Sequence, residues 1–134
     1  MWARMSGPDR RHSAVVARRV ERALGHEASR PVLAAALLHD VGKIESGLRT
    51  YGRVVATLSV KAAGTEAASA WRHQRGFTRR VALYLDHDRL GGDLLQMAGS
   101  DPITVAWARE HHRPHDEWTL PQATAEALKG ADDD

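Results

Sequence analysis

The sequence contains no cysteine among its 134 residues. Neither disulfides nor thiolate metal sites are therefore available, and any metal ion must be held by histidine and carboxylate side chains. No apolar run approaches the length that a membrane span requires, and residues 1–8 lack the apolar core of a signal peptide. We therefore expect a soluble, cytoplasmic protein with no membrane partner.

An excess of charge of either sign is also missing. The formal net charge is only +2, although 16 of the 19 basic residues are arginine. Arginine makes planar, bidentate contacts with phosphate and carboxylate groups, so an anionic partner is conceivable. The arginines are dispersed along the chain, however, and this favours solvated helix faces over a nucleic-acid-binding patch.

The alternation of polar and apolar residues that predicts a β-strand is absent over any useful length, and no internal repeat is visible. Apolar residues instead recur at helical spacing. This pattern predicts helices over residues 9–24, 31–40, 48–63, 77–85, 87–97, 102–112 and 121–134. Residues 44–47 are predicted to form a turn, and 65–76 a connecting segment. A chain of this length buries about two-thirds of its unfolded surface, so we expect one all-α domain over residues 1–134, with six or seven helices.

One stretch, PVLAAALLHDVGK at residues 31–43, combines an almost wholly apolar helix with polar residues at its end. A helix that is apolar on all sides is buried. Its last turn would therefore carry His39 and Asp40 into the interior or into a cleft. Two ionisable neighbours are costly there unless a charged partner satisfies them, and a divalent cation would do so.

Further ionisable residues end or interrupt apolar helical stripes elsewhere in the chain. They are His12, His87, His111, His112 and Asp132. Imidazole and carboxylate groups that converge from several helices can bind divalent ions such as Mn, Fe, Co, Zn or Mg. Three remaining histidines occur in polar or loop contexts and are predicted to lie at the surface: His26, His73 and His115.

Each candidate ligand also has a structural interpretation. His12 on an apolar stripe could be a hydrogen-bonded core residue, and His87 could pair with a neighbouring aspartate at the surface. His111 and His112 lie about 100° apart around a helix, so we expect at least one of them to be a ligand. Either aspartate after Asp132 could replace it, but only Asp132 follows Leu128 by four residues, on the inward face.

The order of these residues resembles that of the HD superfamily of metal-dependent phosphohydrolases, which has a compact helical bundle. Shared features are a histidine on the first helix, a His-Asp pair after an apolar helix, and a late aspartate. LLHDVGK at 37–43 is the most specific match and looks like the motif of the HD-GYP branch, as do HDRLGGDLL at 87–95 and EHH at 110–112. The Gly-Tyr-Pro signature is absent, and residues 41–86 form a longer segment than that branch has. The resemblance therefore does not imply a cyclic dinucleotide substrate, and HD-type diadenosine tetraphosphate hydrolases are another similar group.

The resemblance implies two ion sites that share one carboxylate. The first would comprise His12, His39, Asp40 and Asp132. The second would be completed by His87, His111 and His112, with Asp40 bridging. It further implies a phosphomonoesterase or phosphodiesterase that cleaves a small phosphorylated substrate, such as a nucleotide, with a metal-bridging hydroxide.

Two residues receive catalytic roles in this hypothesis. Asp40 would orient the hydroxide, and Lys43 would reach a non-bridging phosphoryl oxygen as a point charge. A solvated lysine at a helix C-terminus is the alternative for Lys43. Arg89 and Arg113 are further candidate phosphate contacts.

Two other functions stay open: a non-catalytic HD domain for signalling or ligand binding, and a di-iron oxygenase on the same scaffold. Dioxygen consumption would separate oxidation from hydrolysis. The sequence does not indicate the metal, the number of ions, the substrate or the oligomeric state.

Overall fold

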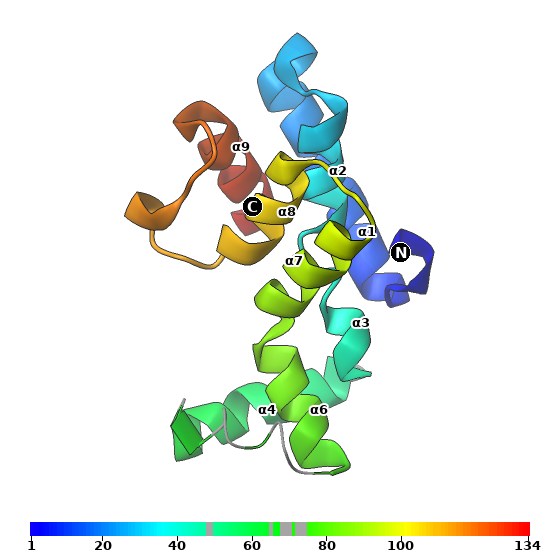
Figure 1. Cartoon of the computed structure of the whole chain (residues 1–134), viewed down its shortest axis with the longest axis vertical. Coiled ribbons are helices and arrows are strands. Elements are labelled where there is room, and N and C mark those ends of the chain that lie inside the picture. The colour runs from blue at the N-terminus through cyan, green and yellow to red at the C-terminus, as the bar shows by residue number, and fades with distance from the viewer. Residues whose placement is uncertain (48–49, 65, 68–70, 72–74) are drawn as a thin grey trace.

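The computed structural model describes residues 1–47, 50–64, 66–67, 71 and 75–134, and over these residues it is all-α, as predicted, without strands. The helices (Figure 1) are α1 (Gly7–Leu24), α2 (Arg30–Leu38), α3 (Lys43–Ser46), α4 (Thr50–Ala63), α6 (Phe77–Leu85), α7 (His87–Met97), α8 (Pro102–Glu110) and α9 (Gln122–Asp133). Short 3-10 turns are η1 (Trp2–Arg4), η2 (Gly25–Glu27) and η4 (His115–Glu117). The start of the predicted helix 48–63 and most of the predicted connecting segment 65–76 lie outside the described residues, and so does His73.

α1 and α8 each begin after a polar capping residue. Ser6 precedes α1, and its hydroxyl oxygen accepts a hydrogen bond from the Asp9 backbone N–H at 3.3 Å. Asp101 precedes α8 in the same way and accepts from the Ile103 N–H at 2.9 Å. Such caps satisfy backbone donors that have no partner within the helix, and each contributes about 1 kcal/mol.

The stretch after α2 differs from the prediction in two details. α2 ends at Leu38, so His39 and Asp40 lie in the turns that follow it rather than in its last turn. The backbone tightens there, since the Val41 N–H donates to the Leu38 carbonyl at 3.0 Å. The turn predicted over 44–47 is wrong, because residues 43–46 form the single helical turn α3. The Ser46 hydroxyl stabilises it by donating to the Lys43 carbonyl at 2.7 Å.

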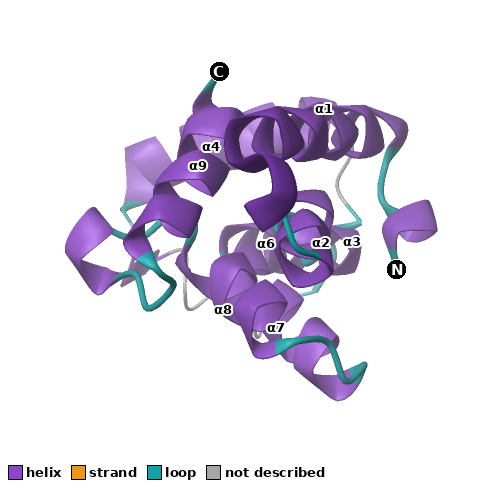
Figure 2. Ribbon diagram, turned by 90° about the horizontal axis from the view of Figure 1, so that it is seen from above, coloured by secondary structure: helices purple, strands orange, loops and turns teal. Residues whose placement is uncertain are grey.

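Four helices surround the main core. Figure 2 shows α2 between α1 and α8, with α9 beside α1 and α7 beyond α8. Most of its buried side chains come from α1, α2, α8 and α9 and include Val16, Val20, Val32, Ala35, Trp107 and Leu128. α3, α4 and α6 lie together below this core in Figure 1, and α6 contacts α3, α4 and α7. Because α2 is buried, the residues just after it reach the interior of the bundle.

Two glycines bring the turn after Asp40 into backbone contact with α7. A Cβ atom on Gly42 would lie 1.9 Å from the His87 carbonyl oxygen and 2.6 Å from the Gly91 nitrogen. A Cβ on Gly91 would in turn lie 3.0 Å from the Gly42 nitrogen. No side chain fits at Gly42, and this close approach places Asp40 beside His87.

We therefore expect Gly42→Ala to destabilise the fold by about 3 kcal/mol, because the added methyl group meets rigid backbone on α7. Chemical denaturation followed by circular dichroism would measure the change. Gly130→Ala is the matched control: a Cβ there meets nothing within 4 Å, and alanine should stabilise α9 by roughly 0.5–1 kcal/mol. Equal stabilities of the two variants would contradict the close contact.

Candidate metal centre

The structure brings all seven predicted metal ligands into one cluster. They come from α1, from the turn after α2, from the start of α7, from the end of α8 and from α9: His12, His39, Asp40, His87, His111, His112 and Asp132. Of the remaining histidines, His26 and His115 are exposed, as predicted.

The first group of candidate ligands lies between α1, α2 and α9. His12, His39 and Asp40 each offer one ligand atom, and these atoms lie within 4.8 Å of one another. Asp132 joins them, since its Oδ1 is 2.8 Å from His12 Nε2 and 3.4 Å from His39 Nε2. The side chain of His12 is 43% exposed, so this group opens to solvent.

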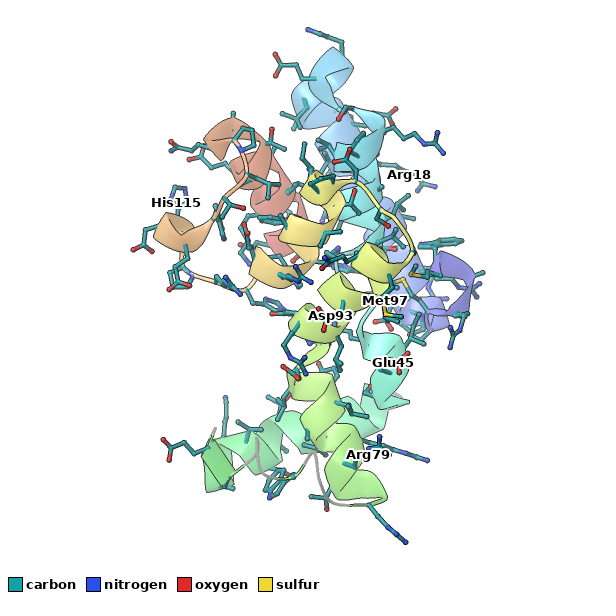
Figure 3. The ribbon with its side chains drawn as sticks, viewed as in Figure 1. Arg18, Glu45, Arg79, Asp93, Met97 and His115 are labelled. Atoms are coloured by element: carbon teal, nitrogen blue, oxygen red, sulfur yellow. The ribbon has the colours of Figure 1, made fainter. Side chains whose placement is uncertain are left out.

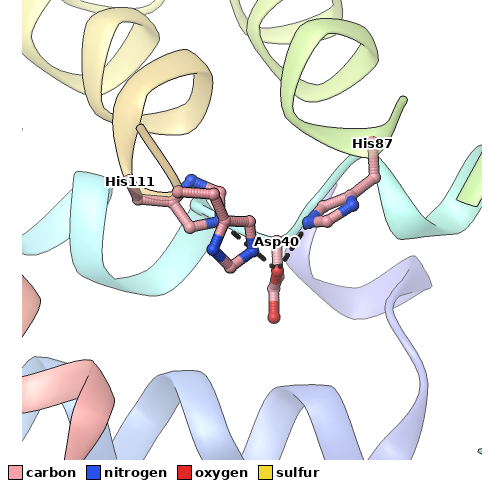
Figure 4. Close-up of side chains that lie close together, drawn as sticks. Asp40, His87 and His111 are labelled. Carbon is pink, nitrogen blue, oxygen red and sulfur yellow. Dashed lines mark ion pairs between the residues drawn. The ribbon is translucent and has the colours of Figure 1, made fainter. Parts of the chain in front are cut away.

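The second group lies between the turn after α2, α7 and α8. Asp40, His87, His111 and His112 again offer ligand atoms within 4.8 Å of one another. Figure 4 shows His87 and His111 approaching the Asp40 carboxylate from two helices. Their Nε2 atoms lie 3.3 Å and 3.8 Å from Asp40 Oδ1. His111 is completely buried, whereas His112 is exposed, so this group also reaches solvent.

Asp40 belongs to both groups and uses a different oxygen toward each. Its Oδ2 lies 3.5 Å from His39 Nε2, whereas its Oδ1 faces His87 and His111. Lys43, the second predicted catalytic residue, places its ammonium group against Asp40 Oδ2. A carboxylate with one oxygen toward each ligand group has the geometry to bridge two ions.

Hydrogen bonds to the backbone fix the rings of three histidines. The Nδ1 atoms of His39, His87 and His111 lie 2.9, 2.8 and 3.2 Å from the carbonyl oxygens of Ala36, Tyr84 and Trp107. An Nδ1 that donates to a carbonyl carries the ring proton, which leaves the Nε2 of a neutral imidazole with a lone pair. In all three residues this Nε2 faces the centre, as metal ligands require.

Nε2 of His111 is buried without a hydrogen-bond partner among the described residues. Beside it, Nε2 of His87 and Oδ1 of Asp88 are also buried, and they lie 2.8 Å from each other as an ion pair. A buried polar atom costs roughly 1–3 kcal/mol when nothing satisfies it. Two imidazole nitrogens and a carboxylate oxygen that face one another form a donor set suited to a borderline divalent cation. The residues present therefore fit a metal ion.

The electrostatics of the site also call for positive charge. Burial alone would raise the pKa of Asp40, but His87, His39 and Lys43 hold it well below its usual value. Asp132 likewise keeps a lowered pKa, because contacts with His39 and His12 outweigh its burial. Burial would lower the pKa of His87, but Asp40 and Asp88 raise it to about 9. Without a metal, the carboxylates thus hold a proton on His87.

Asp88 is a candidate ligand that was not predicted from the sequence. Its Oδ1 lies 2.8 Å from His87 Nε2 and 3.6 Å from His111 Nε2, beside the second group. The sequence pattern indicated it only as a surface partner of His87. The signal that pointed to it is the second His-Asp dipeptide at residues 87–88, which lacks the buried helix that precedes the first.

A family comparison agrees with this geometry. Residues 11–132 match the family model described as HD domain, a span that includes every candidate ligand. The chain belongs to the HD domain family. The recognition made from the sequence is thereby confirmed, together with the all-α HD fold. Comparisons with curated proteins and with solved structures give no match.

Family membership gives the coarse chemistry of the site. HD domains bind divalent metal ions and are typical of metal-dependent hydrolases. Family membership and the His and Asp clusters together identify this centre as a candidate divalent-metal site. In the described part of the chain, no helix has the length and apolarity to cross a membrane.

The second group predicts a role for Asp88 in metal binding. Asp88→Asn removes the buried charge at nearly constant volume, so we expect bound metal to fall by about one ion per chain, or its affinity by at least tenfold. Elemental mass spectrometry after dialysis would measure this. Asp116→Asn, at an exposed position of η4, should retain the metal, and equal retention by both variants would refute the role of Asp88.

Metal affinity should also depend on pH through His87. Because the pKa of His87 is about 9, a metal ion must displace its proton at pH 7 and meets less competition as the pH rises. The expected gain in affinity is up to about tenfold per pH unit below pH 9. Competition with a chromophoric chelator at pH 7.0 and 8.5 would measure it. His87→Gln should bind more weakly with a flatter pH dependence, and a dependence as steep as that of the wild type would contradict this origin.

Proposed function

We propose that this HD domain is a divalent-metal-dependent phosphohydrolase that acts on a small phosphate ester such as a nucleotide. The single observation that carries the proposal is the position of Asp40. It is buried, its pKa is strongly lowered, and each of its oxygens faces a separate group of ligands. This is the arrangement expected for a carboxylate that bridges two ions.

Divalent ions held by the two ligand groups would lower the pKa of a water molecule and neutralise charge on the phosphoryl oxygens. The chain contributes the placement. The Nδ1 contacts with backbone carbonyls aim His39, His87 and His111 at the centre. Ionised Asp40 and Asp132 provide negative charge on the two sides of His39.

In this proposal Lys43 orients Asp40, in addition to the phosphate contact predicted from the sequence. Its ammonium group contacts Asp40 Oδ2 and its side chain is 16% exposed. It therefore orients the carboxylate through the hydrogen bond and remains close enough to solvent to meet a substrate anion. The contact with a non-bridging phosphoryl oxygen stays a prediction.

The same donor set is compatible with iron, because imidazole and carboxylate ligands suit several divalent metals. A di-iron oxygenase and a non-catalytic ligand-binding domain are therefore the two competing outcomes. Five histidines with carboxylates form a complete set for two ions, which supports catalysis over binding alone.

The test starts from protein stripped of metal and then reloaded, in separate samples, with Mn, Fe(II), Co, Zn or Mg. p-Nitrophenyl phosphate and bis(p-nitrophenyl) phosphate serve as monoester and diester probes. We expect hydrolysis only in reloaded samples, and a loss of at least about a thousandfold in Asp40→Asn, because the shared carboxylate is gone. Circular dichroism checks that the variant folds.

Asp116→Asn serves again as the control and should keep full activity. Turnover that persists in the stripped protein would rule out the metal-dependent mechanism. Dioxygen uptake by the Fe(II) sample without phosphate release would favour the oxygenase. Metal binding with neither reaction would favour the non-catalytic domain.

A further inference from the structure

An open pocket of about 360 Å³ lies beside the second group of ligands. Seven residues line it: Leu85, Asp86, Asp88, Arg89, Arg109, His112 and Arg113. Asp88 and His112 belong to the metal centre, so the pocket is continuous with it. Its size lies at the small end of the range for ligand sites, about 300–1,000 Å³.

Two of the three arginines in this pocket are held by neighbouring residues. Arg89 Nε donates to Asp86 Oδ2 at 3.0 Å. Arg109 Nη2 donates to Asp93 Oδ1 at 2.8 Å and to Gln96 Oε1 at 2.7 Å. Asp93, labelled on α7 in Figure 3, also lies 3.4 Å from Arg89 Nη1. One carboxylate thus orients two guanidinium groups along the same wall.

The second glycine of the HDRLGGDLL stretch helps to place Arg109. A Cβ on Gly92 would lie 2.3 Å from Arg109 Cγ and 2.5 Å from its Nε. The arginine side chain therefore lies directly on the α7 backbone, in space that any other residue at position 92 would occupy. Gly92 is not part of either ligand group. Its role is to leave the space in which the Arg109 side chain lies.

Arg113 is the third arginine, and it follows the ligand His112 directly. Its side chain makes no ion pair or hydrogen bond with the described residues. Asp86 and Asp93 compensate Arg89 and Arg109, while Asp88 faces His87. The guanidinium of Arg113 is therefore left with its charge uncompensated at the edge of the pocket.

From this arrangement we propose that the pocket binds a second phosphate group of the substrate, next to the one that is cleaved. The inference rests on the proposed hydrolysis and narrows its substrate class to phosphate esters that carry a further phosphate. Arginine matches phosphate with bidentate, charge-assisted hydrogen bonds. Leu85 is the only apolar residue in the described lining, and His112 is the only ring, so the pocket suits phosphate better than a nucleobase.

Two non-hydrolysable probes separate this proposal from turnover: methylenediphosphonate, with two phosphonate groups, and methylphosphonate, with one. Isothermal titration of Mn-loaded protein, with free Mn in excess, gives the ratio of their dissociation constants. We expect wild-type protein to favour the diphosphonate, and Arg113→Gln to reduce that preference by about tenfold while affinity for methylphosphonate stays unchanged. Arg113→Lys should keep more of the preference than Arg113→Gln does, because lysine retains the positive charge but lacks the bidentate guanidinium group.

Arg18→Gln is the matched control, since it removes the same charge at an exposed position of α1 outside the pocket. An unchanged preference in Arg113→Gln, or an equal loss in Arg18→Gln, would overturn the proposal. Binding of both probes is measured without catalysis. The titration therefore tests the phosphate pocket independently of the proposed hydrolysis. A preference that depends on Arg113 in a protein without phosphatase activity would mean that the pocket is real and the proposed reaction is wrong.

Discussion

The buried carboxylate of Asp40 is the constraint on which the rest of the centre depends. A carboxylate in the interior needs cationic or hydrogen-bonding partners, and Asp40 has histidines on two sides and Lys43 on one of its oxygens. The partners that would satisfy it come from helices far apart in the chain. The helical bundle therefore packs around a buried charge, and the carboxylates of Asp40 and Asp88 raise the pKa of His87 to about 9.

A second constraint is steric, and it positions the Asp40 carboxylate relative to His87. The contact of Gly42 with the His87 carbonyl joins the turn after α2 to the first turn of α7. Because the contact is between backbones, the separation of Asp40 from His87 does not depend on long, flexible side chains. The carbonyls of Ala36, Tyr84 and Trp107 then set the ring orientations. Placement of the ligands thus rests mainly on backbone atoms, which move little.

The sequence predicted the features that depend on local patterning. Helical periodicity and glycine or proline near the helix ends placed most helices, and polar residues on apolar stripes identified His12, His39 and Asp40, which the structure groups together. The features it missed are tertiary. Asp88 reaches the centre only because of how α7 meets the turn after Asp40, and no spacing within residues 87–95 reveals that contact. The single turn of α3 was missed because four residues are too few to show a period.

The surroundings of the two ligand groups bear on how a substrate would approach. Each group has one exposed histidine, which is His12 in the first and His112 in the second, beside buried partners. The second group is bordered by the arginine-lined pocket through His112 and Asp88. Negative charge from the carboxylates would repel an anion at both groups, and Arg113 beside the second group would offset part of that repulsion. A substrate that binds as we propose would place its reacting phosphate between the groups and its remaining charge toward Arg113.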